Sequence, residues 1–524
     1  MKSDTKNTTS KDPEVGLARP ESTRSGTLDR MDKPFSTLSA MAIGATTTNS
    51  AVGIYLTFST TITYGGTMLL FYGFIGMALV GLATAVSLAE LTAGCPDAGG
   101  QYVWVARLAS PKHRRFLSYI TALFSWAGAV CVGGSTCLIS PLMIFEMVTF
   151  FNPDFQYDPW MAFLAYQAVN LSTLIPTLFQ HFLPKFSKGL LMWTLALLLS
   201  VIVGLFAASD DRRSAEDFFT HFHNTSGWSN GVTVLVGLNS LNWCFSCLDS
   251  IVHLSEEIPR PQENIPRALM WSIVVGFSTG LLTIFAFMFN STDYDTQYSA
   301  VTIIYYAFSK SKTAAVAFQS LFFISTIGAQ FGIHVWQSRL AWTIAINKGI
   351  PFHSHLIKVA GSPFNTPIWA LCFSAVWTSI LGCLYLASTS AFNSFTATGI
   401  LFQYASYVIP VVLLNIRGRS KFQHGKFWFP WLGLVANVVL CCWFVVALIF
   451  YSFPYSHPLV LSQMNYVPVV IGCILIIVLA CWFSYGRKHF TFPELEEMQE
   501  GEHASFPPRT TIEREAVVHL GTAS

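Results

Sequence analysis

Two apolar segments of the chain carry polar residues at the depth where a membrane span is expected to be driest. In the segment Phe35–Thr60 the polar run is Thr46–Ser50, with hydroxyl and amide groups in consecutive positions. In the segment Gly231–His253 it is Asn239–Asn242, and Asp249 follows. Such groups can hydrogen-bond a polar solute, and a carboxylate can also hold a cation or a proton. A bilayer tolerates unwound backbone only where it faces protein or a water-filled cavity, so the two interruptions predict a central binding site for a solute.

The composition requires that most of the chain lies in lipid. Hydrophobic residues make up 52% of the 524 residues, charged residues make up 11%, and the mean hydropathy is +0.49. A crossing needs about 20 apolar residues, and about twelve such runs are present. They lie at Leu38–Thr60, Thr67–Glu90, Phe116–Phe150, Trp160–Leu178, Gly189–Ala208, Gly231–His253, Ala268–Phe289, Thr313–Ile346, Pro367–Ala387, Phe392–Ile416, Trp428–Phe453 and Tyr466–Tyr485. We therefore expect an all-α polytopic membrane protein.

The basic residues predict the orientation. They gather in loops such as Arg107–Arg115 and Arg417–Lys426, which are expected on the cytoplasmic side, together with Arg339. Residues 1–34 and 488–524 have the composition of disordered cytoplasmic tails, which leaves residues 35–487 as the transmembrane domain. The plasma membrane is the expected location, with the vacuole or another endomembrane as the alternative.

Two motifs follow the second and the sixth expected spans. Pro96–Tyr102 reads PDAGGQY, and His253–Pro259 reads HLSEEIP, followed by IPRA at Ile265–Ala268. Together with Thr-Asn-Ser-x-x-Gly at Thr48–Gly53, they resemble the amino acid–polyamine–organocation superfamily of secondary transporters. Thr48–Gly53 and the HLSEE part of the second motif are most similar to the fungal amino acid/choline transporter family, which includes choline and 4-aminobutyrate permeases. The resemblance covers approximately Phe35–Tyr485.

This resemblance implies a five-plus-five inverted repeat of the leucine-transporter type, with discontinuous helices one and six and two additional helices at the end. The solute then lies near the midplane, between the broken halves of the two helices. The residues expected to bind it are Thr48, Asn49, Ser50 and Gly53 on the first span, and Trp243, Phe245 and Asp249 on the sixth. The alternative is that the polar residues only hydrogen-bond one span to another.

Asp249 has three roles open to it. An ionisable group at this depth costs about 2.5–3.5 kcal/mol on insertion scales, so it is expected to be paired, protonated or functional. It could bind a cationic head group, carry a coupling proton, or accept N–H groups of unwound backbone. His253 lies four residues on and either relays a proton with Asp249 or is a structural histidine.

Trp243 occupies the position of an aromatic residue that covers the substrate in relatives. Such a ring contributes about 2 kcal/mol to the binding of a desolvated quaternary ammonium group. Tyr55, Gln330 and Tyr404 are further wall residues by their placement in the spans.

Charged residues near the expected cytoplasmic mouth are predicted to form an inner gate. They are Glu256, Glu257, Arg260, Arg267 and Arg107. In two expected outer loops, Asn224 and Asn290 begin glycosylation sequons. The coupling ion stays open, because Gly189–Ala208 lacks the lysine that some proton-coupled bacterial relatives carry in the fifth span.

These features favour a permease that moves small amino acids or related amines such as 4-aminobutyrate by alternating access. The first alternative is a choline or quaternary ammonium permease driven largely by the membrane potential. A non-transporting nutrient sensor of the same fold is the alternative from another class. The expected partners are the small solute, lipid and a coupling proton. No enzymatic activity, cofactor, metal or nucleic acid is expected, because the spans hold no constellation of His, Asp and Glu that would support one.

Overall fold

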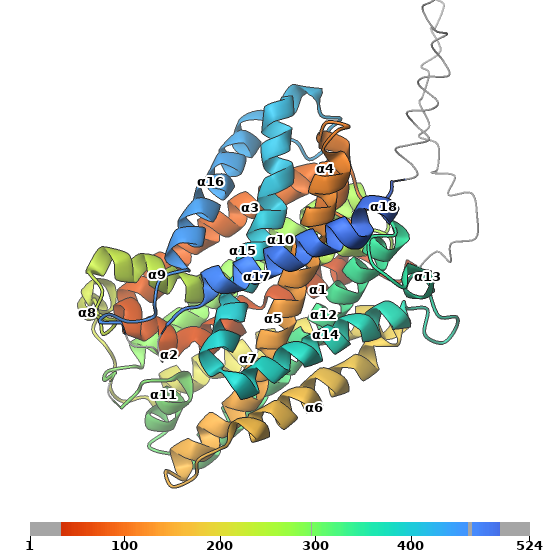
Figure 1. Ribbon diagram of the computed structural model, residues 1–524. Helices are drawn as coiled ribbons and strands as arrows, with labels where there is room; N and C mark the ends of the chain where they lie inside the picture. Colours follow the sequence, from red (N-terminus) through yellow and green to blue (C-terminus); the bar gives the residue numbers. More distant parts are fainter. Residues whose placement is uncertain (1–32, 295, 460–463, 493–524) are drawn as a thin grey trace, which may run out of the picture.

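The computed structural model describes residues 33–294, 296–459 and 464–492, and the regular structure in these ranges is helical (Figure 1). The first half contains α1 (Thr37–Thr48), α2 (Ser50–Met68), α3 (Phe74–Gly94), α4 (Gln101–Leu108), α5 (Arg114–Phe151), α6 (Pro159–Thr177) and α7 (Leu183–Ala208). The second half contains α8 (Ala215–Thr220), α9 (Asn230–Trp243), the 3-10 helix η3 (Leu248–Leu254), α10 (Pro261–Phe289), α11 (Ala300–Ala307), α12 (Lys312–Ile346), α13 (His353–Leu356), α14 (Ile368–Ala387) and α15 (Thr389–Arg417). They are followed by α16 (Pro430–Phe450), α17 (Val467–Cys481) and the short α18 (Arg487–His489).

About twelve of these helical segments cross the membrane. Ten helical stretches are long and apolar enough to do so, and one of them, Thr37–Gly94, has 58 residues and is long enough for two crossings. The chain turns between these two crossings at Gly66, whose φ of 61° and ψ of −142° suit glycine and few other residues. The 19-residue helix α6 is the further crossing. The protein is thus a multi-pass integral membrane protein, as the composition predicts.

The two halves repeat the same order of elements. In each half a broken first helix is followed by a long second helix, then by an eight-residue helix, α4 or α11, and then by the longest helix of that half. The longest helices, α5 with 38 residues and α12 with 35, pack against each other. The next long helix of each half, α6 or α14, follows this longest helix, and the two lie side by side along one edge of the molecule (Figure 1). Helix α17 crosses the face formed by α5 and α15 (Figure 1). This order fits the predicted five-plus-five repeat with two additional helices.

The first break is a single residue. Asn49 has left-handed backbone angles, with φ of 39° and ψ of 61°, and it separates α1 from α2. Asparagine is among the residues that adopt this conformation at little cost. The preceding threonines stay helical, and the hydroxyls of Thr46 and Thr47 are satisfied by the carbonyls of Ala42 and Ile43 one turn earlier.

The second break lies further along the chain than the polar run Asn239–Asn242 predicts, within the stretch Trp243–Asp249 that the family resemblance aligns with the unwound region. Asn239–Asn242 is helical and belongs to α9, whereas the backbone unwinds after Trp243 and resumes as η3 at Leu248. Cys247 has a left-handed φ of 64°, and its N–H donates to Gln403 Oε1 on α15 at 3.1 Å. The position of this break therefore depends on a tertiary contact with a distant helix.

The packed part of the chain extends into the predicted C-terminal tail. Phe490 is fully buried, and its carbonyl accepts a hydrogen bond from Arg115 Nε at 2.8 Å. Phe492 is also buried. The rest of the predicted tails, residues 1–32 and 493–524, lies outside the described residues.

Candidate functional site

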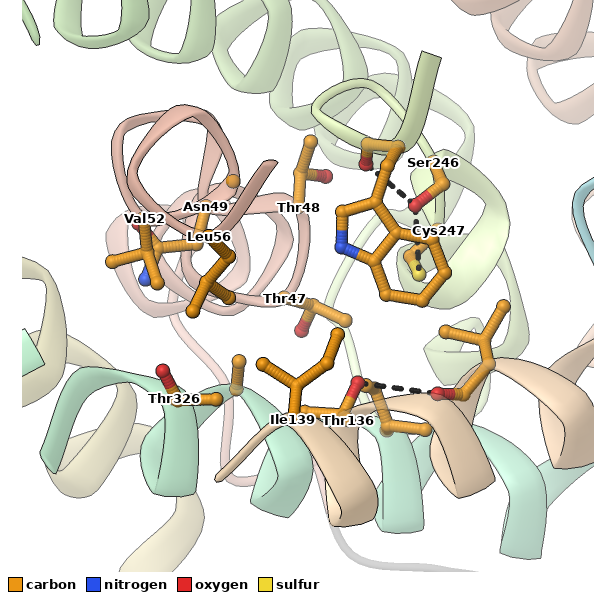
Figure 2. Close-up of a pocket in the computed structure, with 15 residues that line it drawn as sticks. Thr47, Thr48, Asn49, Val52, Leu56, Thr136, Ile139, Ser246, Cys247 and Thr326 are labelled. Carbon is orange, nitrogen blue, oxygen red and sulfur yellow. Dashed lines mark hydrogen bonds between the residues drawn. The ribbon is translucent and has the colours of Figure 1, made fainter. Parts of the chain in front are cut away.

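A small central cavity lies where the two breaks meet (Figure 2). Its volume is about 30 Å³, and α1, α2, α5, α9, α12 and the segment between α9 and η3 contribute to its walls. The lining residues are Thr47, Thr48, Asn49, Val52, Gly53, Leu56, Val132, Thr136, Ile139, Trp243, Ser246, Cys247, Thr326, Ala329 and Ile333. None of these side chains is charged, so the polarity of the cavity comes from hydroxyls, an amide and backbone groups.

Four of the seven predicted binding residues line this cavity, namely Thr48, Asn49, Gly53 and Trp243. Thr48 Oγ1 and Asn49 Nδ2 are buried and have no hydrogen-bond partner among the described residues. Buried polar groups are nearly always satisfied, so these two unpaired groups among the lining residues leave hydrogen-bonding capacity that water or a ligand could complete.

Ser50 and Phe245 do not line the cavity. Ser50 Oγ donates to the carbonyl of Cys244 at 2.6 Å and thereby joins the first break to the second. Phe245 is 2% exposed and packs against the ring of Phe74, with centroids 5.0 Å apart. For these two residues the contacts are those of the alternative, in which side chains hold the spans together.

Gly53 also brings the two breaks into close contact. A Cβ atom at this position would lie 3.0 Å from Cys244 Sγ and 3.3 Å from Cys244 Cα. The backbone of α2 therefore approaches the unwound segment more closely than a larger residue allows.

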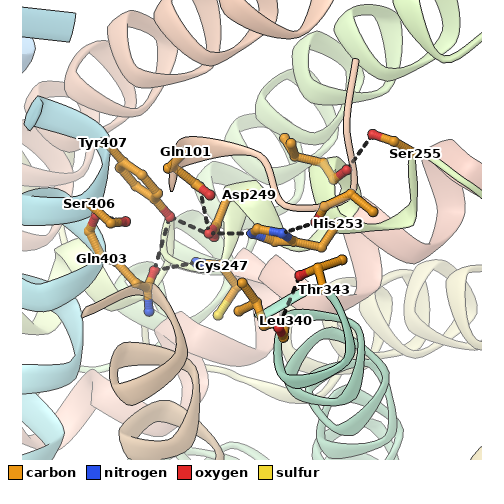
Figure 3. Close-up of polar contacts among 12 residues, drawn as sticks. Gln101, Cys247, Asp249, His253, Ser255, Leu340, Thr343, Gln403, Ser406 and Tyr407 are labelled. Carbon is orange, nitrogen blue, oxygen red and sulfur yellow. Dashed lines mark hydrogen bonds and ion pairs between the residues drawn. The ribbon is translucent and has the colours of Figure 1, made fainter. Parts of the chain in front are cut away.

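Asp249 is fully buried beside the central cavity and is not part of its lining (Figure 3). Its carboxylate accepts hydrogen bonds from Gln101 Nε2 at 2.8 Å and from the hydroxyl of Tyr407 at 2.7 Å. His253 Nε2 lies 3.3 Å from the same carboxylate. Asp249 thus links η3 to α4 and α15, so direct contact with a solute would require the cavity to open further.

The two nitrogens of His253 constrain where protons reside. Nδ1 lies 2.7 Å from the carbonyl oxygen of Ala98, which can only accept a hydrogen bond, so Nδ1 carries a hydrogen. The contact between Nε2 and the Asp249 carboxylate is a hydrogen bond only if a further proton lies between them. The pair can therefore hold one proton in a site closed to solvent.

A second, larger hollow of about 350 Å³ adjoins the cavity, and we call it the outer vestibule because residues such as Tyr157 and Ser299 belong to expected outer loops. Leu56 and Ile139 line both spaces. The other residues that line the outer vestibule are Tyr55, Ser59, Leu142, Met143, Glu146, Thr149, Tyr157, Ser299, Ala300 and Val301. Glu146 is not among the residues that the sequence singles out, although it lies within the expected span Phe116–Phe150. Of the other predicted wall residues, Gln330 and Tyr404 line neither space.

On the other side of the central cavity, one buried ion pair holds several helices together. Arg339 and Glu257 are each 1% exposed and form two hydrogen bonds, Nε to Oε1 at 2.7 Å and Nη2 to Oε2 at 3.2 Å. Gln180 donates to Glu257 at 2.9 Å, and Arg339 donates to Thr366 at 3.0 Å. The sequence predicts Glu257 as part of the inner gate. It assigns Arg339 to a cytoplasmic loop, but Arg339 lies within α12 and is buried.

The other predicted gate residues lie apart from this pair. Arg260 approaches Glu263 at 4.0 Å and is largely exposed, and Arg107 provides a carbonyl oxygen to Arg417. Arg267 forms no salt bridge with a described acidic residue, and Glu256 has interactions of its own.

The two sequon asparagines differ in accessibility. Asn224 is half-buried and donates from Nδ2 to the carbonyl of Trp228 at 2.8 Å. Asn290 is 2% exposed, and its Nδ2 donates to the carbonyl of Ala286 at 2.7 Å. A glycan on Asn290 would have to displace both the packing and this hydrogen bond.

Comparisons with known proteins place the whole membrane domain in one family. Residues 35–479 match the model of the amino acid permease family. A transmembrane transporter, swnT, of Metarhizium robertsii is 49% identical over 464 residues, which are 88% of this chain and 93% of that protein. The swainsonine transporter of Arthroderma benhamiae is 48% identical over the same shares of each chain. The choline transporter of Saccharomyces cerevisiae is 32% identical over 90% of this chain and 85% of its own length.

A solved structure confirms the fold at a greater distance. A manganese transporter of Eremococcus coleocola superposes with a TM-score of 0.51 at 13% identity, covering 86% of this chain and 96% of that one.

Proposed function

The chain belongs to the amino acid permease family, and from this premise we propose that it carries a small solute with a charged amino or ammonium group by alternating access. The observation that carries the proposal is the central cavity. It lies where both broken helices meet, and it holds two buried polar groups without a partner. Substrates of such repeats bind at this place.

The helix ends around the cavity favour an ammonium group. The carboxyl ends of α1 and α9 both point into this region, and the carbonyl groups at a helix end carry partial negative charge. The indole of Trp243 adds an aromatic face for a cation. The named solutes of two relatives agree, because choline is a quaternary ammonium alcohol and swainsonine is a hydroxylated bicyclic amine. Thr48 and Asn49 would hydrogen-bond the hydroxyl groups of such a solute.

A small amino acid such as 4-aminobutyrate is the second candidate. It is favoured by the N-terminus of α2. The N-cap residue Asn49 makes no side-chain hydrogen bond to the backbone N–H groups of the first turn. A carboxylate is stabilised by such an N-terminus. The same cavity could therefore hold a zwitterion, with its amine at the carboxyl ends and its carboxylate at α2.

We infer further that Asp249 and His253 bind the coupling proton. The pair is closed to solvent, a proton shared between Nε2 and the carboxylate would make their 3.3 Å contact a hydrogen bond, and the pair anchors η3, which is one half of a broken helix. Loss of that proton would leave an ionised carboxylate and a neutral ring in contact, with no hydrogen bond between them. The anchor of η3 would thereby weaken, which couples proton release to movement of this half-helix.

Glu257 and Arg339 are proposed as the inner gate in place of the wider cluster predicted from the sequence. Removing one partner of a buried ion pair destabilises a protein by about 3–5 kcal/mol, because the other charge remains buried and uncompensated. Opening the inner side must therefore separate these groups while water reaches both.

Uptake at a fixed membrane potential tests the proposal. In a transport-deficient yeast, choline, 4-aminobutyrate and common amino acids are supplied at external pH from acid to neutral. We expect accumulation of an ammonium solute. A steep fall in accumulation as the pH rises would support proton coupling, whereas accumulation that is indifferent to pH would leave the potential as the driving force. Signalling without accumulation of any solute would instead favour the nutrient sensor.

A further inference from the structure

Glu146 is the one acidic side chain that lines either the central cavity or the outer vestibule within the described part of the chain. It lies on α5, five residues before the end of that helix, and it is half-buried. Ser299 and Gln319 lie beside its carboxylate. None of the salt bridges formed by the described residues includes Glu146. The vestibule therefore contains a carboxylate without a counter-charge.

The two lysines that precede and begin α12 do not supply that counter-charge. Lys310 and Lys312 rest over the rings of Tyr306 and Phe151, and neither lysine lines the vestibule. Glu146 does act electrostatically on Tyr298. Burial is the larger cause that raises the pKa of Tyr298, and the nearby Glu146 carboxylate is the second.

The walls around Glu146 suit an organic cation. Tyr157 and Tyr55 contribute aromatic surface, and the ring of Tyr157 is held in place by stacking on Phe145 at 4.6 Å between centroids. Aromatic faces attract cations, and they do so most strongly where water is excluded. The volume of about 350 Å³ is more than ten times that of the central cavity, so the vestibule has room for a solute that the central cavity does not yet admit.

We propose that the outer vestibule is a second binding site for organic cations, in which Glu146 pairs with the ammonium group and Tyr157 covers it. The site lies in line with the central cavity across Leu56 and Ile139 and collects cations before they pass inward. This proposal rests on the proposed function for the part that concerns transport, whereas binding in the vestibule does not require transport.

The test compares Glu146→Gln with Asp154→Asn in the full-length protein. Asp154 is an exposed acidic residue eight positions further on, outside the vestibule, so its replacement removes the same charge from the same side of the molecule. A charged cleft concentrates counter-ions by about ten- to a thousandfold, and we expect Glu146→Gln to raise the KM for choline about tenfold, with kcat nearly unchanged. Added salt should shrink this difference. Asp154→Asn should leave the KM within twofold. The uptake of 4-aminobutyrate should rise or stay level in Glu146→Gln, because the zwitterion has no net charge. Equal KM values for choline in the two variants would overturn the proposal.

Direct binding separates this proposal from the proposed function. Purified full-length protein is titrated with radiolabelled choline as the wild type, as Trp243→Leu, and as Trp243→Leu combined with Glu146→Gln. We expect Trp243→Leu to weaken the central site and to keep a weaker choline site that the second change abolishes. If the double variant binds as much choline as Trp243→Leu, the vestibule site is refuted. If the wild type binds choline at the vestibule but carries no solute, the transport function fails and the site stands.

Discussion

The two breaks, in the first and the sixth membrane-spanning helices, differ in what their polar groups contact. The first is a single left-handed residue, Asn49, and it places unpaired polar groups in the central cavity. The second spans four residues before η3, and distant helices engage polar groups in it and just after it, through Gln403 at Cys247 and through Gln101 and Tyr407 at Asp249 in η3. The groups at the first break are free to hydrogen-bond a solute on the proposed function, whereas those at the second break and in η3 are bonded within the protein.

This difference suggests a division of roles between the repeats. Free groups at the first break can discriminate between solutes, because an unpaired group is satisfied only by the right partner. Bonded groups at the second break must be released before η3 can move. We therefore expect substitutions at the first break to change the KM, and substitutions at the second break to change the rate of transport.

The largest effect is expected for Asp249→Asn, at the second break. The carboxylate accepts hydrogen bonds from Gln101 and Tyr407, and an amide cannot reproduce both acceptors or share a proton with His253. Hydrogen bonds to a charged group contribute about 1.5–3 kcal/mol, which corresponds to a roughly ten- to hundredfold loss of uptake rate. Initial uptake rates, normalised to the protein at the membrane, measure this, with Asp154→Asn as the control. Wild-type accumulation in Asp249→Asn would exclude Asp249 from coupling.

Trp243→Leu should act on affinity, because Trp243 lines the cavity. The loss of a cation–π contact worth about 2 kcal/mol should raise the KM for an ammonium solute up to roughly thirtyfold. Phe245→Leu is the matched control, since that ring is buried against Phe74 and does not face the cavity. It should cost under about 1.5 kcal/mol of stability and leave the KM unaltered. Equal KM values for the two variants would contradict the assignment of Trp243.

Gly53→Ala should drive the two breaks apart. The added Cβ would lie 3.0 Å from Cys244 Sγ and 3.3 Å from its Cα, and overpacking of this kind costs about 1–3 kcal/mol. We expect the low end of that range and a roughly tenfold lower uptake, because the sulfur can shift. Gly76→Ala is the control, as an added Cβ there meets nothing within 4 Å. Thermal unfolding in detergent together with uptake distinguishes the two, and equal behaviour would refute the close contact.

Thr48→Val should have the smallest effect. The change removes a buried hydroxyl that has no partner among the described residues, and a hydrogen bond from it to a solute contributes about 0.5–1.5 kcal/mol. The KM for a hydroxylated amine should rise severalfold, while the KM for an amine without hydroxyls should not. Thr46→Val provides the comparison, because the Thr46 hydroxyl already donates to the Ala42 carbonyl at 2.8 Å. A similar rise in both variants would show that the effect is structural.

The first break could be predicted from the sequence, and the second only in part. A run of polar residues that contains Asn49, in an apolar segment, indicates both a break and the residue type that tolerates it. The second break lies in Cys244–Cys247, whose residues look like ordinary packing residues, and it depends on contacts such as that between Cys247 and Gln403, 156 positions apart. A local sequence pattern does not predict a contact between residues so far apart in the chain.

The same limit applies to the charged residues. Glu257 stands in a recognisable motif, but its partner Arg339 lies 82 positions away, and the positive-inside rule assigns basic residues to loops. Glu146 belongs to no motif that the sequence analysis uses. Its neighbours in the vestibule come from separate helices and loops, and only the fold brings them together.

The position of Leu56 and Ile139 bears on how substrates are identified. Both side chains line the outer vestibule and the central cavity, so on the proposed route a molecule that moves from one space to the other passes them. A wide amine that fits the vestibule but cannot pass would block uptake without ever entering the cell. Competition assays would then rank ligands of the vestibule, and a screen for blockers would find different molecules from a screen for cargo. Counterflow from preloaded vesicles, which scores only molecules that cross, is the assay that separates the two groups.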